Sequence, residues 1–222
     1  MTDFEYSAFL SYRNGKKDTD DLLNSFIKQF YDALQSELKT QTDGLDLFLD
    51  IYQLEGGTIL NAKIGNGICK SVCYIPVFTR NYLSTKKMYC AAELMGILEM
   101  EEKRIKLLGW ENEERSFIFP VILRNREKVP DILGENRISY DFCDFTLSVE
   151  ELKKNGVHVN KFKELANSIA DLYELMENES EEILKECETF KIRDINNKDH
   201  KAEIQAFIKQ HSKRVNSILK LS

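Results

Sequence analysis

The chain has 222 residues, of which 42% are apolar and 31% are charged, and its formal net charge is −6. This length is sufficient for one sizeable hydrophobic core with an appended element, and the composition is typical of a soluble globular protein. The acidic balance and the lack of a basic block argue against nucleic acid as a partner, because phosphate binding needs clustered Lys and Arg.

Membrane proteins and metal-dependent proteins are also disfavoured. No apolar run reaches the ~18 residues of a membrane span, and the N-terminus does not resemble a signal peptide. The three histidines are late and far apart in the sequence, so we expect no metal site and no histidine-based dyad. The cysteines are odd in number and lack a CxxC pair, which predicts free thiols in the cytoplasm. They are Cys69, Cys73, Cys90, Cys143 and Cys187.

Apolar patterns predict strands that alternate with helices over about the first 140 residues. The strands are expected at 6–12, 45–49, 72–78, 117–123 and 138–142, and the helices at 22–38, 58–69 and 84–107, with Ser84 as a helix N-cap. Pro76 counts against a central position for its strand, because proline cannot donate to the ladder. The alternation is typical of an α/β fold with a doubly wound parallel sheet.

Helices dominate the rest of the chain. Residues 160–177 carry one apolar face, and an acidic cluster follows at 177–182. We expect one domain over 1–177 and a helical extension over 178–222, which either packs on the domain or forms an assembly surface. Its apolar residues are Ile204, Phe207, Ile208, Val215, Ile218 and Leu219.

The loops that follow the first two strands are candidate ligand sites, because a doubly wound sheet binds ligands at the carboxyl ends of its strands. Residues 11–17 hold Tyr12 and three cations, including Arg13, which can bind a phosphate without forming a P-loop; the alternative is a solvated basic turn. The second loop holds Asp50 and the pair Gly56-Gly57; it can contact a ribose, or it is a flexible surface connection.

Glu93 is the most informative residue of the chain. It is the only charge in the apolar run 88–98, and Tyr89 and Cys90 precede it by about one helical turn. A poorly solvated carboxylate is typical of an active site. The alternative is an exposed Glu93 on the face opposite a core stripe. That stripe would comprise Met88, Ala91, Ala92, Met95 and Leu98.

Together, these three segments resemble the TIR (Toll/interleukin-1 receptor) domain, particularly its NAD-cleaving members. Residues 8–13 resemble the opening box of the family, and 48–57 resemble its second box and the loop that follows. Residues 89–94 resemble the helix that carries the catalytic glutamate, with Tyr89 where the family usually has Trp. The resemblance covers about residues 4–140 and the helix near 160. It implies a flavodoxin-like, five-stranded fold.

The resemblance implies an NAD nucleosidase that cleaves the nicotinamide–ribose bond, with NAD as substrate and no cofactor. Glu93 is then the catalytic residue, and the substrate-binding residues are Tyr12, Arg13, Asp50, Tyr89 and Cys90. The products would be nicotinamide and ADP-ribose, or a cyclic or transferred form. Family members also suggest an immune or anti-phage role, homo-oligomers formed through TIR–TIR contacts, and an effector or sensor protein as partner.

Two other readings of the sequence remain open. Many TIR domains assemble without turnover, and their glutamate position need not be acidic; the acid at Glu93 favours the enzyme. A flavodoxin-like nucleotide binder or receiver is the third reading. A receiver would need an acid pair after the first strand, where this chain has Ser11-Tyr12-Arg13.

Overall fold

A computed structural model describes residues 4–13, 21–42, 44–49, 60–86, 88–146, 152–154, 156–185, 187 and 189–212. Its strands are β1 (Tyr6–Tyr12), β2 (Asp46–Leu49), β3 (Ser71–Phe78), β4 (Val121–Ile122) and β5 (Tyr140–Asp141). They form one parallel sheet in the order β2-β1-β3-β4-β5. The prediction of a flavodoxin-like, doubly wound sheet is therefore confirmed.

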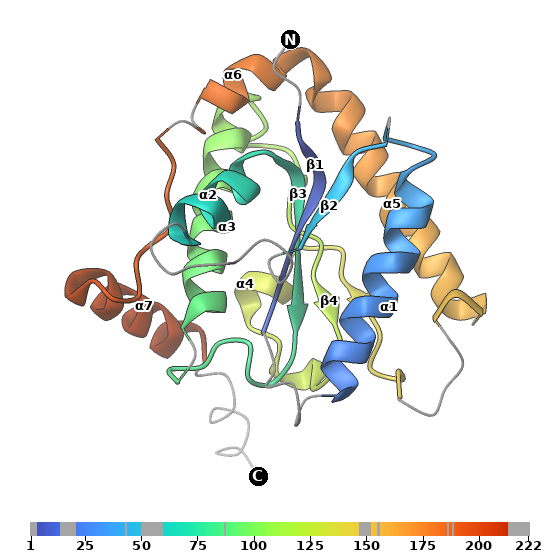
Figure 1. Cartoon of the computed structure of the whole chain (residues 1–222). Coiled ribbons are helices and arrows are strands. Elements are labelled where there is room, and N and C mark those ends of the chain that lie inside the picture. The colour runs from blue at the N-terminus through green and yellow to red at the C-terminus, as the bar shows by residue number, and fades with distance from the viewer. Residues whose placement is uncertain are drawn as a thin grey trace.

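Two pairs of long helices cover the two faces of the sheet (Figure 1). Helices α1 (Asp21–Leu38) and α5 (Gly156–Met176) pack together on one face, and α2 (Leu60–Cys69) and α3 (Tyr89–Leu107) pack on the other. All eight residues of β3 are buried as a result. The remaining elements are η2 (Arg126–Lys128), α4 (Asp131–Gly134), η3 (Leu152–Lys154), η4 (Glu177–Glu179), α6 (Ser180–Lys185) and α7 (Lys198–His211).

Pro76 lies in a central strand, contrary to the sequence-based expectation, since β3 pairs with both β1 and β4. The amide of Tyr74 donates to Phe117 on the β4 side, so the nitrogen of Pro76, two residues further along, faces the same side. Pairing on that side is a bridge at Tyr74–Ile118 and then a ladder that begins at Val77–Val121. Pro76 therefore lies in a break of the ladder and costs no hydrogen bond there.

The predicted N-cap at Ser84 is also wrong. Helix α3 begins at Tyr89, after Met88, which makes no side-chain cap bond. Ser84 lies in the preceding turn, where its hydroxyl accepts a hydrogen bond from the amide of Lys86 at 3.3 Å. The helix ends at Leu107, as predicted.

The segment after α6 lies across α2 and α3; we call residues 187 and 189–212 the strap. A disulfide joins Cys187 to Cys69 at the end of α2. Phe190 and Ile192 then pass over Gly65 of α2 and Gly96 of α3. A Cβ atom at Gly65 would lie 2.9 Å from the Phe190 carbonyl oxygen, and one at Gly96 would lie 2.9 Å from Ile192. The two glycines therefore allow the strap to approach both helices closely.

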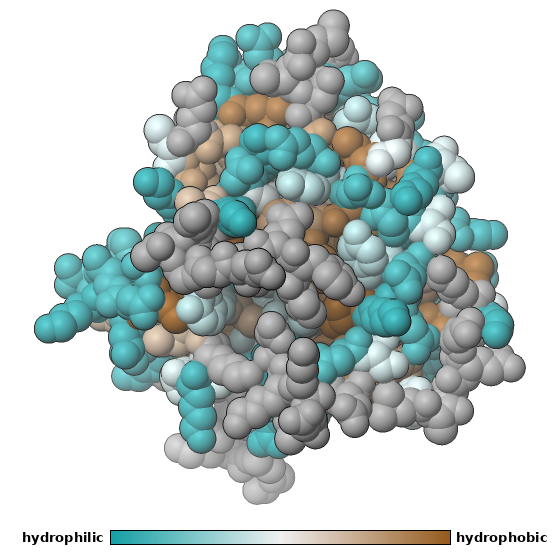
Figure 2. All heavy atoms as spheres, viewed as in Figure 1, coloured by the Kyte–Doolittle hydropathy of each residue, from teal (hydrophilic) through white to brown (hydrophobic). Residues whose placement is uncertain are grey.

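Helix α7 completes the strap by packing on the outer side of α3. Ile204 and Ile208 cover Ala91 and Ala92, and all four are buried. Arg193 forms ion pairs with Glu99 of α3 and Glu203 of α7. In Figure 2 the outer surface of α7 is hydrophilic, and hydrophobic residues appear where it meets the rest of the molecule. The domain boundary at 177 stays a prediction.

The disulfide corrects the expectation that all five cysteines are free. Cys69 and Cys187 are 118 residues apart, a pairing that no local spacing motif can reveal. Cys73, Cys90 and Cys143 are not part of a disulfide. None of the helices in the described part of the chain has both the length and the apolar character that crossing a bilayer requires.

The close approach at Gly65 predicts that alanine there lowers stability. Its methyl group would meet the backbone of Phe190 and Lys191, which cannot rotate away. The expected cost of such overpacking, about 1–3 kcal/mol, exceeds the gain of up to ~1 kcal/mol from helix propensity. Urea unfolding of Gly65→Ala should therefore show a lower free energy of unfolding than the wild type.

Gly156→Ala is the matched control, because a Cβ atom at this first residue of α5 meets nothing within 4 Å. This control should be neutral or slightly stabilising. If Gly65→Ala were as stable as Gly156→Ala, the backbone of Phe190 and Lys191 would not pack closely on Gly65.

Candidate functional site

Glu93 lies where the carboxyl ends of β1 and β3 meet the first turns of α3. Its side chain faces the sheet and is 3% exposed, so the exposed alternative is excluded. An ionised carboxylate in such a place is costly unless hydrogen bonds compensate for the lost water. The partners of Glu93 therefore decide what this site can do.

Two hydroxyl groups form a chain that ends on the Glu93 carboxylate. The Ser11 hydroxyl donates to Glu93 Oε2 at 2.6 Å, and its oxygen lies 2.7 Å from the hydroxyl of Tyr82. Ser11 belongs to β1, Tyr82 to the turn after β3, and Glu93 to α3. Ser11 and Tyr82 are at most 1% exposed. Three separate elements thus meet in one buried polar cluster, which we call the hydroxyl relay.

The direction of the relay follows from its protons. A serine hydroxyl has one proton, and Ser11 gives it to Glu93, so Tyr82 donates to Ser11. Burial raises the pKa of Tyr82 well above its usual value; the charges of Cys90 and Glu93 raise it further, and the bond to Ser11 lowers it in part. Tyr82 therefore keeps its proton and remains a donor.

Packing on both sides of α3 explains why Glu93 faces inward. The predicted core stripe instead packs against α7, where Ala91 and Ala92 are buried under Ile204 and Ile208. The face turned toward the sheet carries Glu93 and two further charged residues, Glu101 and Arg104, all three buried. The stripe was correctly identified as apolar, but its partner is the strap.

The other predicted site residues differ in how far they are exposed to solvent. Tyr12 is the last residue of β1 and is buried, and Arg13 follows it directly and is half-buried. Tyr89 begins α3 and is 38% exposed, whereas Cys90 beside it is buried. These four residues lie at the same edge of the sheet as Glu93. Asp50 and residues 51–59 lie outside the described residues.

Tyr82 was missed as a candidate from the sequence, and Ser11 lay within the candidate loop 11–17 without a role of its own. Ser11 is the penultimate residue of β1, a position whose side chain can face the start of a neighbouring helix. Tyr82 lies in a turn without any motif. The turn is closed by a bond from the Tyr82 amide to the carbonyl of Thr79 at 2.9 Å. Only the folded chain brings these hydroxyls to Glu93.

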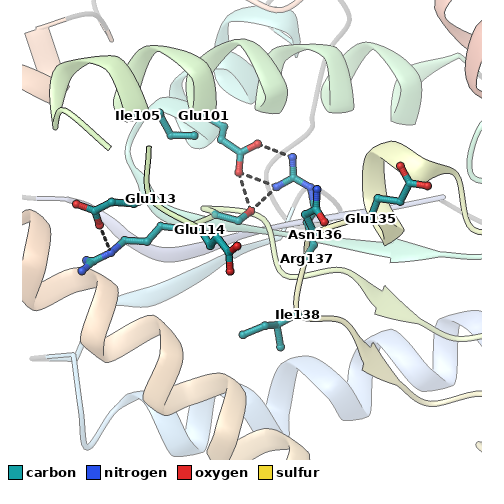
Figure 3. Close-up of a pocket in the computed structure, with 10 residues that line it drawn as sticks. Glu101, Ile105, Glu113, Glu114, Glu135, Asn136, Arg137 and Ile138 are labelled. Atoms are coloured by element: carbon teal, nitrogen blue, oxygen red, sulfur yellow. Dashed lines mark hydrogen bonds and ion pairs between the residues drawn. The ribbon is translucent and has the colours of Figure 1, made fainter. Parts of the chain in front are cut away.

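A cavity of about 810 Å³ lies at the opposite edge of the sheet, beside the segments that precede β4 and β5 (Figure 3). Glu101 of α3 lies at its wall, and Arg137 binds both of its carboxylate oxygens, at 2.7 and 2.6 Å. The amide of Phe117 also donates to it at 3.0 Å. Its charge is neutralised by an ion pair, so Glu101 is a structural carboxylate.

Metal binding has no support within the described ranges, where no group of three or more His, Cys, Asp or Glu could hold an ion. The arrangement at Glu93 instead offers one oriented carboxylate at a sheet edge where ligands bind in doubly wound folds. A carboxylate of this kind can stabilise positive charge that develops on a substrate.

Comparisons with known proteins identify the sequence pattern. A family model described as TIR domain matches residues 9–154. A curated protein named "Probable translation initiation factor IF-2", from Sulfurisphaera tokodaii, is 26% identical over 105 residues; the match covers 47% of this chain and 17% of that protein. The chain therefore spans less than a fifth of the length of this relative.

Among solved structures, the chain is similar to the TIR domains in the structure of the activated Roq1 resistosome directly recognizing the pathogen effector XopQ. The TM-score is 0.40 and the sequence identity is 21%, and the match covers 97% of this chain and 98% of the other. A similarity at this level carries no argument about function.

The protonated state of Tyr82 predicts a loss of stability at high pH. Burial also raises the pKa of Tyr74 and Tyr140 above the usual ~10. Above pH ~10 the unfolded chain loses these phenolic protons while the folded chain retains them, so the free energy of unfolding falls. Tyr82→Phe should reduce this slope by up to about 1.4 kcal/mol per pH unit in urea unfolding between pH 9 and 11.

Tyr89→Phe provides the comparison for this measurement, since Tyr89 is 38% exposed. An equal slope in Tyr82→Phe and the wild type would mean that the Tyr82 phenol ionises in the folded protein.

Proposed function

Because this chain belongs to the TIR domain family, we propose that it is an NAD nucleosidase that cleaves the bond between nicotinamide and ribose. The observation that carries the proposal is the buried carboxylate of Glu93, held by Ser11 at the carboxyl edge of the sheet. Its place in the second turn of α3 agrees with the family resemblance of residues 89–94.

The proposed chemistry needs one carboxylate. As the bond between ribose C1′ and the nicotinamide nitrogen breaks, its electron pair leaves with nicotinamide, and the ribose develops oxocarbenium character. Glu93 stabilises that positive charge, as a carboxylate does in glycoside hydrolysis. Nicotinamide enters with a positive charge and leaves neutral, so no general acid is required. Water then adds to C1′ and releases a proton, which gives ADP-ribose, or another nucleophile gives a cyclic or transferred product.

The remaining residues have supporting roles in this proposal. Arg13 faces the pyrophosphate, whose negative charge it complements, and the exposed ring of Tyr89 stacks near nicotinamide. Tyr12 and Cys90 complete the substrate-binding set around the first turn of α3. Asp50 shapes the loop after β2.

The cellular setting is proposed by family analogy. We propose immune or anti-phage signalling, or NAD depletion, by a homo-oligomer formed through TIR–TIR contacts, with an effector or sensor protein as a further partner. We also propose the cytoplasm as its location. A disulfide such as Cys69–Cys187 is unusual in the cytoplasm. Whether these two cysteines are oxidised in cells is therefore a useful observation on the proposed location.

The direct test of the proposed function is NAD consumption by Glu93→Gln. This substitution keeps the shape of the side chain and removes its charge, so stabilisation of the ribosyl cation is lost. We expect turnover to fall by at least about 100-fold, in line with loss of one electrostatic stabiliser. Wild type and variant are incubated with NAD, and the products are resolved by mass, which also identifies the product class.

Glu99→Gln is the matched control, because Glu99 is on the same helix but half-buried and paired with Lys103 and Arg193. It should retain full turnover. If folded Glu93→Gln were as active as the wild type, the assignment of Glu93 would be wrong. A wild type that associates with itself but leaves NAD intact under all conditions would instead support a non-catalytic interaction module.

A further inference from the structure

The hydroxyl relay suggests how the carboxylate of Glu93 is aimed. We propose that Ser11 and Tyr82 are positioning residues that orient Glu93 for its reaction, with Ser11 fixing the carboxylate and Tyr82 fixing Ser11. This inference rests on the proposed function of Glu93. It gives a role to Ser11 and Tyr82. The family resemblance of residues 8–13 and 89–94 gives neither residue a role.

The bond between Ser11 and Glu93 has the geometry of a strong hydrogen bond. The bond from Ser11 to Glu93 Oε2 is 2.6 Å long, within the range of a charge-assisted O–H···O⁻ bond. Ser11 is on β1, whose backbone is fixed by pairing with β2 on one side and β3 on the other. A donor on such a rigid element holds its acceptor in one orientation.

Tyr82 in turn fixes the orientation of the Ser11 hydroxyl. A serine hydroxyl can rotate about its Cα–Cβ bond and donate elsewhere, and the Tyr82 hydroxyl at 2.7 Å restricts this rotation by donating to the same oxygen. Tyr82 itself is immobilised, because it is fully buried, packs beside Phe78 and is held by a backbone bond to Thr79. Hydrogen bonds in such a chain also polarise one another.

Burial makes an oriented donor important for the Glu93 carboxylate. Glu93 and Cys90, three residues before it on α3, are both buried, so water is scarce there. A buried carboxylate without oriented donors adopts whichever rotamer best restores solvation. Ser11 replaces part of that solvation with a donor that Tyr82 holds in place before substrate arrives.

The test is a double-mutant cycle with Ser11→Ala, Tyr82→Phe and the double variant, measured by NAD turnover. We expect kcat to fall about 100-fold for Ser11→Ala and about tenfold for Tyr82→Phe, within the range seen for supporting hydrogen bonds, with KM nearly unchanged because neither hydroxyl contacts substrate. In the Ser11→Ala background, Tyr82→Phe should have almost no further effect, because Tyr82 acts through Ser11.

Tyr74→Phe is the matched control for removal of a buried phenol hydroxyl. Tyr74 is fully buried on β3, and its hydroxyl has no hydrogen-bond partner within the described residues. This variant should leave kcat unchanged. Two purely structural effects would instead lower the melting temperature of both variants and combine additively in kcat, and that outcome would overturn the proposal.

A measurement made without substrate distinguishes a failure of this proposal from a failure of the proposed function. In protein with ¹³C-labelled glutamate carboxyls, the Glu93 resonance is assigned by its loss in Glu93→Gln. Ser11→Ala and Tyr82→Phe should displace this resonance, and Tyr74→Phe should not. A resonance unmoved by both substitutions refutes the relay. If instead the resonance moves and wild type leaves NAD intact, the relay stands and the proposed function fails.

Discussion

The burial of a carboxylate in the second turn of α3 is the constraint on which the site depends. Glu93 cannot lie against the sheet without a donor. Ser11 at the end of β1 donates to it, and Tyr82 in the turn after β3 donates to Ser11. The sheet order places β1 and β3 side by side, so their carboxyl ends both reach α3. Fold topology and site chemistry are thus linked through one acidic side chain.

Helix α3 buries three charged residues, and each is stabilised in a different way. Glu93 accepts from the Ser11 hydroxyl, and Glu101 is bound by Arg137 through both oxygens. Arg104 donates to the carbonyl oxygens of Val72 and Cys69 and lies against the rings of Tyr74 and Phe117. Of the two buried carboxylates, Glu93 is the one that lies at the carboxyl edge of the sheet, where doubly wound folds bind ligands. This position distinguishes Glu93 as the candidate for chemistry.

The sequence predicted the sheet well because its strands are short apolar runs between clear turns. Features that depend on a tertiary contact, and not on the local sequence, were not predictable. Pro76 is central because the β4 ladder is interrupted beside it, and Ser84 does not cap α3 because the helix begins five residues later. The apolar stripe at Ala91 and Ala92 could not be assigned to a partner, because α7 is more than 100 residues away in sequence.

The same limit applies to the site. Glu93 was recognisable because a single charge interrupts an apolar run, which is a local signal. Ser11 and Tyr82 have no comparable signal, since a hydroxyl near a strand end is common and becomes informative only when a carboxylate lies 2.6 Å away. Local patterns therefore identified the acid, and only the tertiary structure identified what holds it.

The disulfide between Cys69 and Cys187 has a topological consequence. It closes a covalent ring of the chain that contains Tyr82 and Glu93, while Ser11 lies on the open arm before Cys69. A single peptide-bond cleavage anywhere inside the ring leaves one covalently connected molecule, and the pieces separate only when the sulfur–sulfur bond is reduced. The half of the site on β1 and the half on α3 would therefore remain tethered after such a nick.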